Sequence, residues 1–320
     1  MIACCAMRLS VVSFFMRGRV SKTIIHQSDI SAWIRCPAEF NFARQGLPNA
    51  TNSASAFGSV MHNSLQVFER VRIAENFDSA VKKAIETFRY YWNPVNIEAI
   101  CDPVPPNGWL PRQGYSELLN RGIDSIRKYA DLVKFDDIEM LATEFSFIVN
   151  IPGTWDEQLQ EPHKLAGSID QLTAGHYNRK LFLHIRDLKT GKEYVHLRQN
   201  MQFTAYSLAT LDPEFWTGGE MEDGFGYDRG MELYERFSGA GRRGTWINLK
   251  TFKMQDAGWR GPKDYTRFAI ACNQIALSIQ ADIFPLSLSG EACTYCAFRD
   301  ICGGVGIGTA DHGKPGNLDG

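Results

Sequence analysis

The sequence offers little that would place the protein in a membrane or give it an overall attraction for nucleic acid. Its 34 Lys and Arg residues are balanced by 36 Asp and Glu residues, so the formal net charge is only −2. The apolar N-terminus is interrupted by Arg8 and lacks the pattern of a signal peptide, and no other stretch suggests a membrane span. We therefore expect a cytoplasmic protein without membrane contact, in which any nucleic-acid surface is local.

ATP-binding and disulfide motifs are also missing. The glycine–lysine pairs at 191–192 and 313–314 are followed by Glu and Pro, so neither forms a Walker A motif. Any ATP-driven partner would therefore be a separate chain. The eight cysteines do not suggest a disulfide framework in a chain without an export signal, and clustered cysteines more often bind metal.

Hydrophobic periodicity predicts an α/β protein whose N-terminal part is mainly helical. Helical spacing of apolar residues runs through four early segments, at 29–45, 58–74, 77–92 and 114–134. Short strand-like segments follow at 139–150, 164–173 and 180–189, with a hairpin between the last two. Later segments suggest a helix, a strand and a second helix at 194–210, 245–254 and 263–281.

No linker or internal repeat divides these elements, so we expect a single folded domain over residues 28–303. Its three parts are a mainly helical region, a core, and a helix with a cysteine cluster, at 28–135, 136–254 and 255–303. The flanking segments are interpreted as an N-terminal extension and a disordered Gly-rich tail, at 1–27 and 304–320.

Asp187 and Lys189 stand two positions apart at the end of an apolar run. In a strand, residues i and i+2 face the same side, so the carboxylate and the ammonium project together. Mg²⁺ prefers one or two carboxylates with water and phosphate oxygens. A neighbouring lysine can position the attacking water and offset charge on the phosphate. By itself, however, this pattern is more often a solvated ion pair.

Three other motifs could bring further groups to this pair. Asp170 closes a G-x-I-D motif on the preceding strand, and an antiparallel hairpin would place it beside Asp187. His62 closes a G-x-x-x-H motif at a helix start and offers an imidazole. Gln202 and Tyr206 share one face of the next helix, where they could hold the lysine or contact a nucleic-acid backbone. Taken singly, each motif has an ordinary structural explanation.

The joint order and spacing of these motifs resemble the RecB-type nucleases of the PD-(D/E)XK superfamily. The matching motifs are Cys36-Pro37, Gly58 to His62, Glu144, Gly167 to Asp170, Asp187-Leu188-Lys189-Thr190-Gly191, and Gln202 to Tyr206. The resemblance runs from about residue 28 to residue 303. It implies a restriction-endonuclease-like core, which is a central mixed sheet flanked by helices.

This resemblance also implies roles for individual residues. The ligands of Mg²⁺ or Mn²⁺ would be His62, Asp170, Asp187 and the backbone carbonyl of Leu188. The catalytic set would be Asp170, Asp187, Lys189, Gln202 and Tyr206. Glu144 matches the family in position but without a clear role. Leu188 stands where an aromatic residue is frequent in the family, a departure that should leave the chemistry intact.

Cys293, Cys296 and Cys302 place three thiolates within ten residues of one another. An iron–sulfur or zinc site needs four ligands, and Cys36 matches a distant N-terminal cysteine of the family. One cysteine before the core and three after it resemble the [4Fe–4S] staple of AddB-like and CRISPR-associated RecB-type nucleases. Zinc is the alternative, because the sulfur count alone does not separate the two metals. Cys272 lies outside the pattern and suggests a buried small hydrophobe.

The segment 241–267 contains seven basic residues and only two aspartates. Basic groups for phosphates, interleaved with aromatic rings for unpaired bases, are typical of a groove that binds single-stranded nucleic acid. The candidate contacts are Arg242, Arg243, Lys250, Lys253, Trp246 and Trp259. The alternative is an exposed hairpin whose aromatic residues face the core.

These observations lead us to expect a DNA nuclease that depends on Mg²⁺ or Mn²⁺ and acts as an exonuclease on DNA ends or single strands. Its setting would be recombination, repair or phage DNA processing, with a separate helicase or recombination protein as a partner. One alternative is a non-catalytic iron–sulfur DNA-binding module of the same fold. Another is an iron–sulfur electron carrier, which would have no use for the carboxylates.

Overall fold

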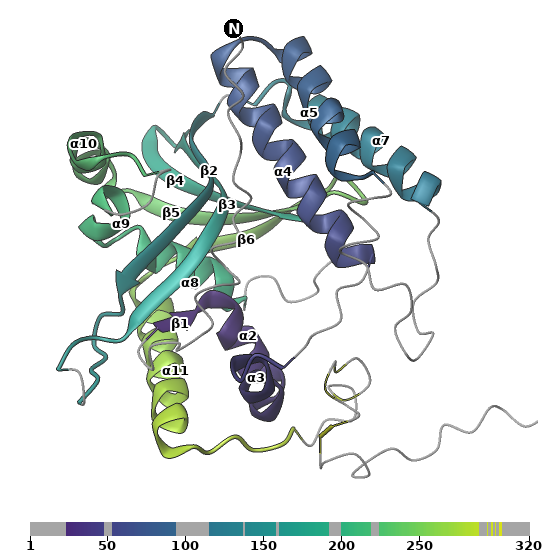
Figure 1. Cartoon of the computed structure of the whole chain (residues 1–320). Coiled ribbons are helices and arrows are strands. Elements are labelled where there is room, and N and C mark those ends of the chain that lie inside the picture. Colours follow the sequence, from purple (N-terminus) through teal and green to yellow (C-terminus); the bar gives the residue numbers. More distant parts are fainter. Residues whose placement is uncertain are drawn as a thin grey trace, which may run out of the picture.

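A mixed six-stranded sheet lies at the centre of the molecule, with helices packed against both of its faces (Figure 1). The computed structural model describes residues 24–47, 53–93, 115–136, 138–157, 160–191, 200–218 and 224–287, together with Cys293, Cys296, Phe298, Ile301 and Cys302. No helix within these segments is long and apolar enough to cross a membrane. The sheet and its flanking helices confirm the expected α/β fold.

The elements follow one another in the order β1 (Ile24–His26), α2 (Gln27–Arg35), α3 (Pro37–Arg44), α4 (Ser53–Ala74), α5 (Phe77–Tyr91), α7 (Tyr115–Val133), β2 (Glu139–Asn150), β3 (Lys164–Tyr177), β4 (Lys180–Lys189), α8 (Met201–Ala209), α9 (Pro213–Thr217), α10 (Tyr227–Phe237), β5 (Gly241–Asn248), β6 (Met254–Arg260) and α11 (Pro262–Ala281). Helices α4, α5 and α7 and strands β2 to β4 lie where hydrophobic periodicity predicted them. Their apolar spacing is regular enough to be recognised without tertiary information.

The N-terminal part differs from the prediction in two places. The helix predicted over 29–45 is two helices, because Cys36 is extended with φ −162° and ψ 110°. A residue before proline disfavours the helical region, and Pro37 then suits the first position of α3. The predicted extension contains β1, which pairs in parallel with Lys164–Ala166 of β3. Residues 1–23 and the tail at 304–320 lie outside the described residues.

The region after α8 contains more regular structure than the sequence suggested. Its acidic, Gly-rich composition concealed α9 and α10, and the single strand predicted at 245–254 is the hairpin β5–β6. Gly230 lies within α10, where a Cβ would be 2.2 Å from the backbone oxygen of Trp216, so glycine allows α10 to pack closely against α9. The β5–β6 turn is closed by Asn248, whose Oδ1 accepts hydrogen bonds from the backbone N–H groups of Lys250 and Thr251.

Strand β3 organises the sheet because it pairs with three other strands. Its first part pairs in parallel with β1, and β2 runs antiparallel along its other edge. Its last part pairs with β4 from Gln171↔Arg186 to Tyr177↔Lys180. The two turn residues between them, 178 and 179, both have positive φ, as a type I′ hairpin turn requires. Beyond the Gln171↔Arg186 pair the two strands separate, and β4 continues beside β5.

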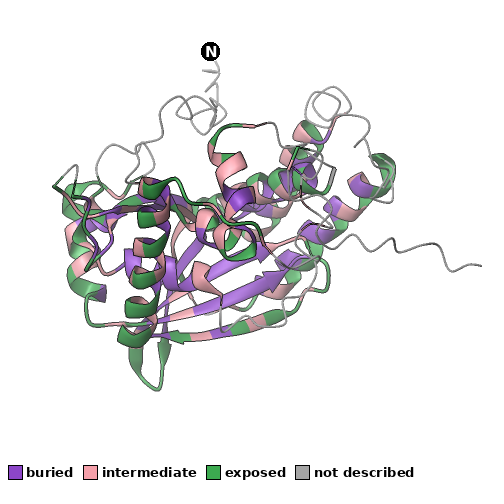
Figure 2. Cartoon of the chain, turned by 90° about the horizontal axis from the view of Figure 1, so that it is seen from below, coloured by how far each residue is buried: buried purple, intermediate pink, exposed green. Residues whose placement is uncertain are grey.

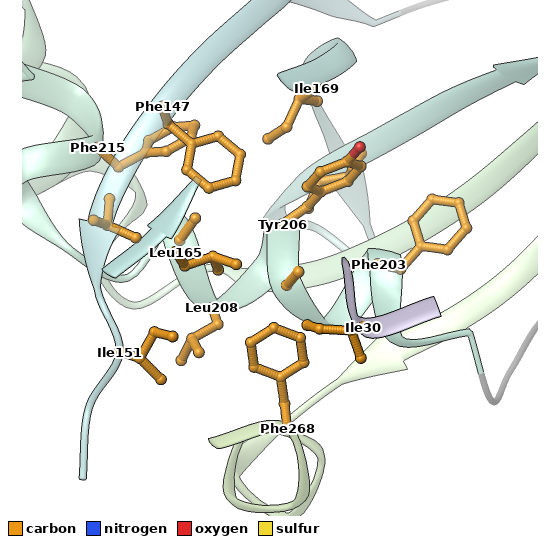
Figure 3. Close-up of a cluster of buried hydrophobic side chains, with 14 of the residues drawn as sticks. Ile30, Phe147, Ile151, Leu165, Ile169, Phe203, Tyr206, Leu208, Phe215 and Phe268 are labelled. Atoms are coloured by element: carbon orange, nitrogen blue, oxygen red, sulfur yellow. The ribbon is translucent and has the colours of Figure 1, made fainter. Parts of the chain in front are cut away.

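Two buried clusters hold the helices on the sheet. The larger surrounds α8, whose residues 203–209 are all buried, and Figure 3 shows part of it. The smaller lies under α4, α5 and α7 and reaches the sheet at Leu188, Ile247 and Leu249. Full burial of one such apolar side chain contributes about 1.5–3 kcal/mol. In Figure 2 the strands are mainly buried, whereas the helices keep exposed outer sides. The end of β4 therefore lies between two cores.

Candidate active site

His62, on α4, lies close to oxygen atoms from three different strands. Its Nδ1 lies 3.0 Å from Oε1 of Glu144, and its Nε2 lies 3.0 Å from the backbone oxygen of Leu188. Oδ1 of Asp170 is 3.6 Å from the same Nδ1. The imidazole therefore joins β2, β3 and β4 at one point.

Asp170 and Asp187 lie at the fork where β3 and β4 separate. Their chain neighbours Gln171 and Arg186 form the last cross-strand pair, so both aspartates stand just beyond the paired part of the hairpin. Oδ2 of Asp170 accepts a hydrogen bond of 2.6 Å from the backbone N–H of Leu188. The hairpin predicted from the sequence thus brings the two carboxylates together, across a fork rather than within a ladder.

The carboxylate of Asp187 accepts hydrogen bonds from two side chains. Nζ of Lys189 lies 3.0 Å from Oδ1 and 2.9 Å from Oδ2, as the i, i+2 spacing of a strand allows. Nε2 of Gln202 donates to Asp187 Oδ1 at 2.8 Å and to the hydroxyl of Tyr206 at 2.8 Å. Asn200 caps α8 by accepting the backbone N–H of Gln202, which fixes this side chain at the first helical turn.

Of the two motif glycines near the site, Gly167 is the one at which a side chain would crowd its neighbours. A Cβ on Gly167 would lie 2.9 Å from the ring of Phe147 and 3.4 Å from that of Tyr206. A Cβ on Gly58 would lie 3.4 Å from Oγ1 of Thr190, at the end of the Asp-x-Lys strand. The first contact would force a neighbour to shift, so Gly167 is required for α8 and β2 to pack on β3.

Glu144 has a backbone conformation that no sequence pattern indicated. It lies in β2, opposite Asp170, yet its φ is 50°. The left-handed region is uncommon for a residue with a side chain, and such strain costs about 1–3 kcal/mol. Strain of this kind clusters at functional sites, and here the strained residue places its carboxylate against His62. Only its position in the motif order pointed to Glu144.

The electrostatics of the cluster reflect burial and an excess of carboxylates. Burial raises the pKa of Asp187 to about 6, Asp170 adds to this shift, and Lys189 opposes it. Burial also raises the pKa of Asp170, although His62 acts against it. Burial disfavours the imidazolium of His62, but Asp170 and Glu144 outweigh it and raise the pKa of His62 to about 9. Burial likewise disfavours the ammonium of Lys189, yet Asp187 and Asp170 raise its pKa.

The donor set suits a hard divalent cation. His62, Glu144 and Asp170 each offer one ligand atom, and these three atoms lie within 4.8 Å of one another. Asp187 and the backbone oxygen of Leu188 adjoin this group. Carboxylate and carbonyl oxygens with an imidazole are ligands that Mg²⁺ and Mn²⁺ accept. Three carboxyl groups face one imidazole and one ammonium, so a cation at this point would offset the remaining negative charge.

In the comparison with protein families, the model described as the PD-(D/E)XK nuclease superfamily matches residues 26–303. The chain belongs to this superfamily. Its members are hydrolases that act on DNA, usually with divalent metal ions, which agrees with the donor set around His62. No curated protein matches the sequence. A solved structure described as "Crystal structure of SSO0001" matches with 12% identity and a TM-score of 0.35, covering 91% of each chain, a likeness too low to carry an argument.

In this PD-(D/E)XK protein the N-terminal cysteine lies close to the C-terminal segment. Cys36 is buried between α2 and α3. The ring centroids of Phe42, on α3, and Phe298 are 5.6 Å apart. Burial raises the pKa of Cys296, and Cys36 and Cys302 add to this shift because their charges act on it. The structure therefore brings residues from both ends of the domain into one region. Cys272 is buried elsewhere, as expected.

The candidate contacts in the basic segment 241–267 do not share one surface, because strands β5 and β6 bury some of them and expose others. Arg242 is buried, and its guanidinium donates to backbone carbonyls at the end of α10 and to Thr210. Trp246 is buried in the core around α8. These two residues are therefore corrected from surface candidates to core residues, and the alternative in which aromatic residues face the core holds for Trp246.

The other four candidates are exposed or half-exposed and occupy opposite ends of the β5–β6 hairpin. Arg243 lies over the rings of Tyr177 and Trp259, at 5.9 and 5.7 Å from their centroids, and pairs with Asp256. Arg243 pairs with His184, which is three positions before Asp187 on β4, a distance of about 10 Å. Lys250 and Lys253 are exposed in the turn at the other end. That turn follows Leu249, whose N–H donates to the backbone oxygen of Lys189, so it adjoins the candidate site.

Proposed function

We propose that this protein is a RecB-type exonuclease that hydrolyses phosphodiester bonds of DNA with Mg²⁺ or Mn²⁺. The observation that carries the proposal is the convergence of His62, Glu144 and Asp170 within 4.8 Å, beside the Asp187–Lys189 pair. Membership of the PD-(D/E)XK superfamily supports hydrolysis of DNA. The assignment to the RecB type and to exonucleases rests on the order and spacing of the motifs.

The residues that would hold the ion are His62, Asp170, Asp187 and the backbone carbonyl of Leu188, with Glu144 adjoining them. When bound, a divalent ion supplies a more acidic water and stabilises charge on the phosphate.

The chain itself supplies the orientation of the reacting groups. Both oxygens of Asp187 hold the ammonium of Lys189, which can then donate a hydrogen bond to the attacking water or to a phosphate oxygen as negative charge develops. Gln202 also donates to Oδ1 of Asp187, and it contacts the hydroxyl of the buried Tyr206. These contacts form before substrate binds, so little reorganisation is needed during the reaction.

The test is cleavage of labelled DNA by wild type and by Asp187→Asn, which keeps the shape of the side chain and removes its charge. We expect wild type to cleave with Mg²⁺ or Mn²⁺ and to stop with chelator. Asp187→Asn should remain folded and lose cleavage, whereas Asp124→Asn, in an exposed ion pair on α7, should cleave normally. Unaltered cleavage by Asp187→Asn would refute the assignment. Linear DNA degraded beside intact closed circles distinguishes an exonuclease from an endonuclease.

We further propose that Cys36, Cys293, Cys296 and Cys302 hold a [4Fe–4S] cluster that ties the two ends of the domain together. The electrostatic effect of Cys36 and Cys302 on Cys296 indicates that both lie near it, which supports this ligand set. A tetrahedral zinc site would use the same four thiolates. Metal analysis after anaerobic purification separates iron from zinc.

The DNA strand would reach the site past the β5–β6 turn. Lys250 and Lys253 are the exposed basic residues there, and the register places them nearer to Lys189 than Arg243. We therefore assign the phosphate contacts close to the site to these two lysines. Arg243, Tyr177 and Trp259 would contact bases or phosphates farther along the strand, because half-exposed rings beside a guanidinium suit stacking.

A further inference from the structure

A buried polar network touches the fork that carries the two aspartates. Gln171 and Arg186 are the last pair of β3 and β4, and their chain neighbours are Asp170 and Asp187. The separation of the two carboxylates therefore depends on where this pairing stops. Any contact that fixes Gln171 or Arg186 also fixes the geometry of the candidate metal site.

The hydroxyl of Tyr129, on α7, is the centre of this network. It donates to Oε1 of Glu69 at 2.6 Å and accepts from Nε2 of Gln171 at 2.6 Å. Nε of Arg72 donates to Oε2 of the same Glu69 at 2.8 Å. Tyr129, Glu69 and Gln171 are at most 1% exposed, so water does not replace these bonds. Arg186 is anchored separately, because its guanidinium donates to Asp136 at 2.8 Å.

Glu69 connects the network to the helix that carries His62. The two residues are seven positions apart on α4, which is two helical turns, so they lie on the same side and about 10 Å apart. Tyr129 thus holds α4 against the β3–β4 fork at a second point beyond the contacts of His62 itself. Apolar packing would tolerate small sliding of the helix. A buried hydrogen-bond chain is satisfied in only a narrow range of positions.

We propose that Tyr129, Glu69 and Gln171 are positioning residues of the metal site, which set the spacing between His62 on α4 and the two aspartates at the fork. This inference rests on the proposed function of the same site. The three side chains touch neither substrate nor metal. Their effect is on how well the ligands are arranged before the ion arrives.

The test is titration of the metal-free protein with Mn²⁺, followed by calorimetry, for Tyr129→Phe against wild type. Removing the hydroxyl leaves two buried polar groups without their partner, and loss of such outer contacts weakens metal binding by about tenfold or more. DNA affinity measured without metal should stay the same. The matched control is Tyr115→Phe at the start of the same helix, whose hydroxyl donates to the backbone oxygen of Trp92. It removes the same atom away from the fork and should leave Mn²⁺ affinity unchanged.

A conservative variant separates positioning from general stability. Glu69→Gln retains an acceptor for Tyr129 and should bind Mn²⁺ nearly as wild type does, whereas Glu69→Leu should resemble Tyr129→Phe. The double variant Tyr129→Phe/Glu69→Leu should be no weaker than either single one, because both remove the same bond. Urea unfolding of each metal-free variant records any loss of stability separately.

The outcomes distinguish this inference from the proposed function. Wild-type Mn²⁺ affinity in Tyr129→Phe would overturn the positioning role. Equal weakening by Tyr129→Phe and Tyr115→Phe, in step with their stability loss, would also overturn it. If the wild-type protein binds Mn²⁺ yet never cleaves DNA, the proposed nuclease function is refuted. The comparison of Tyr129→Phe with wild type would still decide whether Tyr129 positions the metal ligands. If wild type binds no Mn²⁺ at all, both are refuted.

Discussion

Metal binding at this site should release a proton from His62. Both ring nitrogens of His62 face acceptors only, the carboxylate of Glu144 and the backbone oxygen of Leu188. An imidazolium can donate to both, whereas a neutral ring can donate to one. This geometry agrees with the raised pKa of about 9, so the metal-free protein carries His62 as a cation at neutral pH. A metal ion needs the neutral ring and must displace the proton.

The size of the effect follows from the pKa. At pH 7.5, removing a proton from a group with a pKa of about 9 costs about 2 kcal/mol, which lowers metal affinity about 30-fold. Metal affinity should therefore rise with pH, by about tenfold per pH unit between pH 6 and 9, and level off above pH 9. Below pH 6 the slope should steepen, because the carboxyl of Asp187, with a pKa of about 6, must also lose a proton.

Calorimetry with Mn²⁺ measures this directly. Titrations at pH 7.5 in buffers of different ionisation enthalpy should show about one proton released per ion, as the pKa of His62 requires. His62→Gln should bind Mn²⁺ more weakly and release almost none. In the metal-free protein the raised pKa stabilises the fold below pH 6.5, and this contribution is lost as pH rises through about 9. Metal affinity independent of pH between 6 and 9, without proton release, would refute the reasoning.

Three further predictions concern the lysine, the DNA surface and the cysteines. Lys189→Ala should keep Mn²⁺ and DNA binding but lose about 10²–10³-fold in single-turnover cleavage, and a defect confined to DNA affinity would make Lys189 a phosphate contact only. Charge reversal at Lys250 and Lys253 should weaken DNA binding and reduce the slope of log affinity against log salt by about one per contact, so an unchanged slope would exclude them. Anaerobically purified protein should contain iron and sulfide. Cys36→Ser should lose both, together with solubility, while Cys272→Ser keeps them; a fully coloured Cys36→Ser would place the fourth ligand elsewhere.

Local periodicity in the sequence was enough to predict much of the fold and several members of the candidate site. Strand β2 has the predicted bounds because its apolar residues are regularly spaced. Asp187 and Lys189 share one side of a strand, and Gln202 and Tyr206 share one face of a helix, because these spacings depend only on the repeat of the backbone. Helix α10 was missed because its glycine serves close packing against α9 rather than a loop.

By contrast, the use of each side chain was decided by packing between distant elements. Arg242 and Arg243 are adjacent and chemically identical, yet the alternation of β5 buries one against α10 and leaves the other between two half-exposed rings. The backbone of Glu144 is strained, and its carboxylate contacts His62 on α4, a residue 82 positions away in the sequence. The chemical groups of the candidate site, and the helix or strand that carries each of them, could be predicted without the fold. The point at which β3 and β4 separate could not be read from either strand, because Gln171, in the last pair, is held by a hydrogen bond to Tyr129 on α7, which lies far away in the chain.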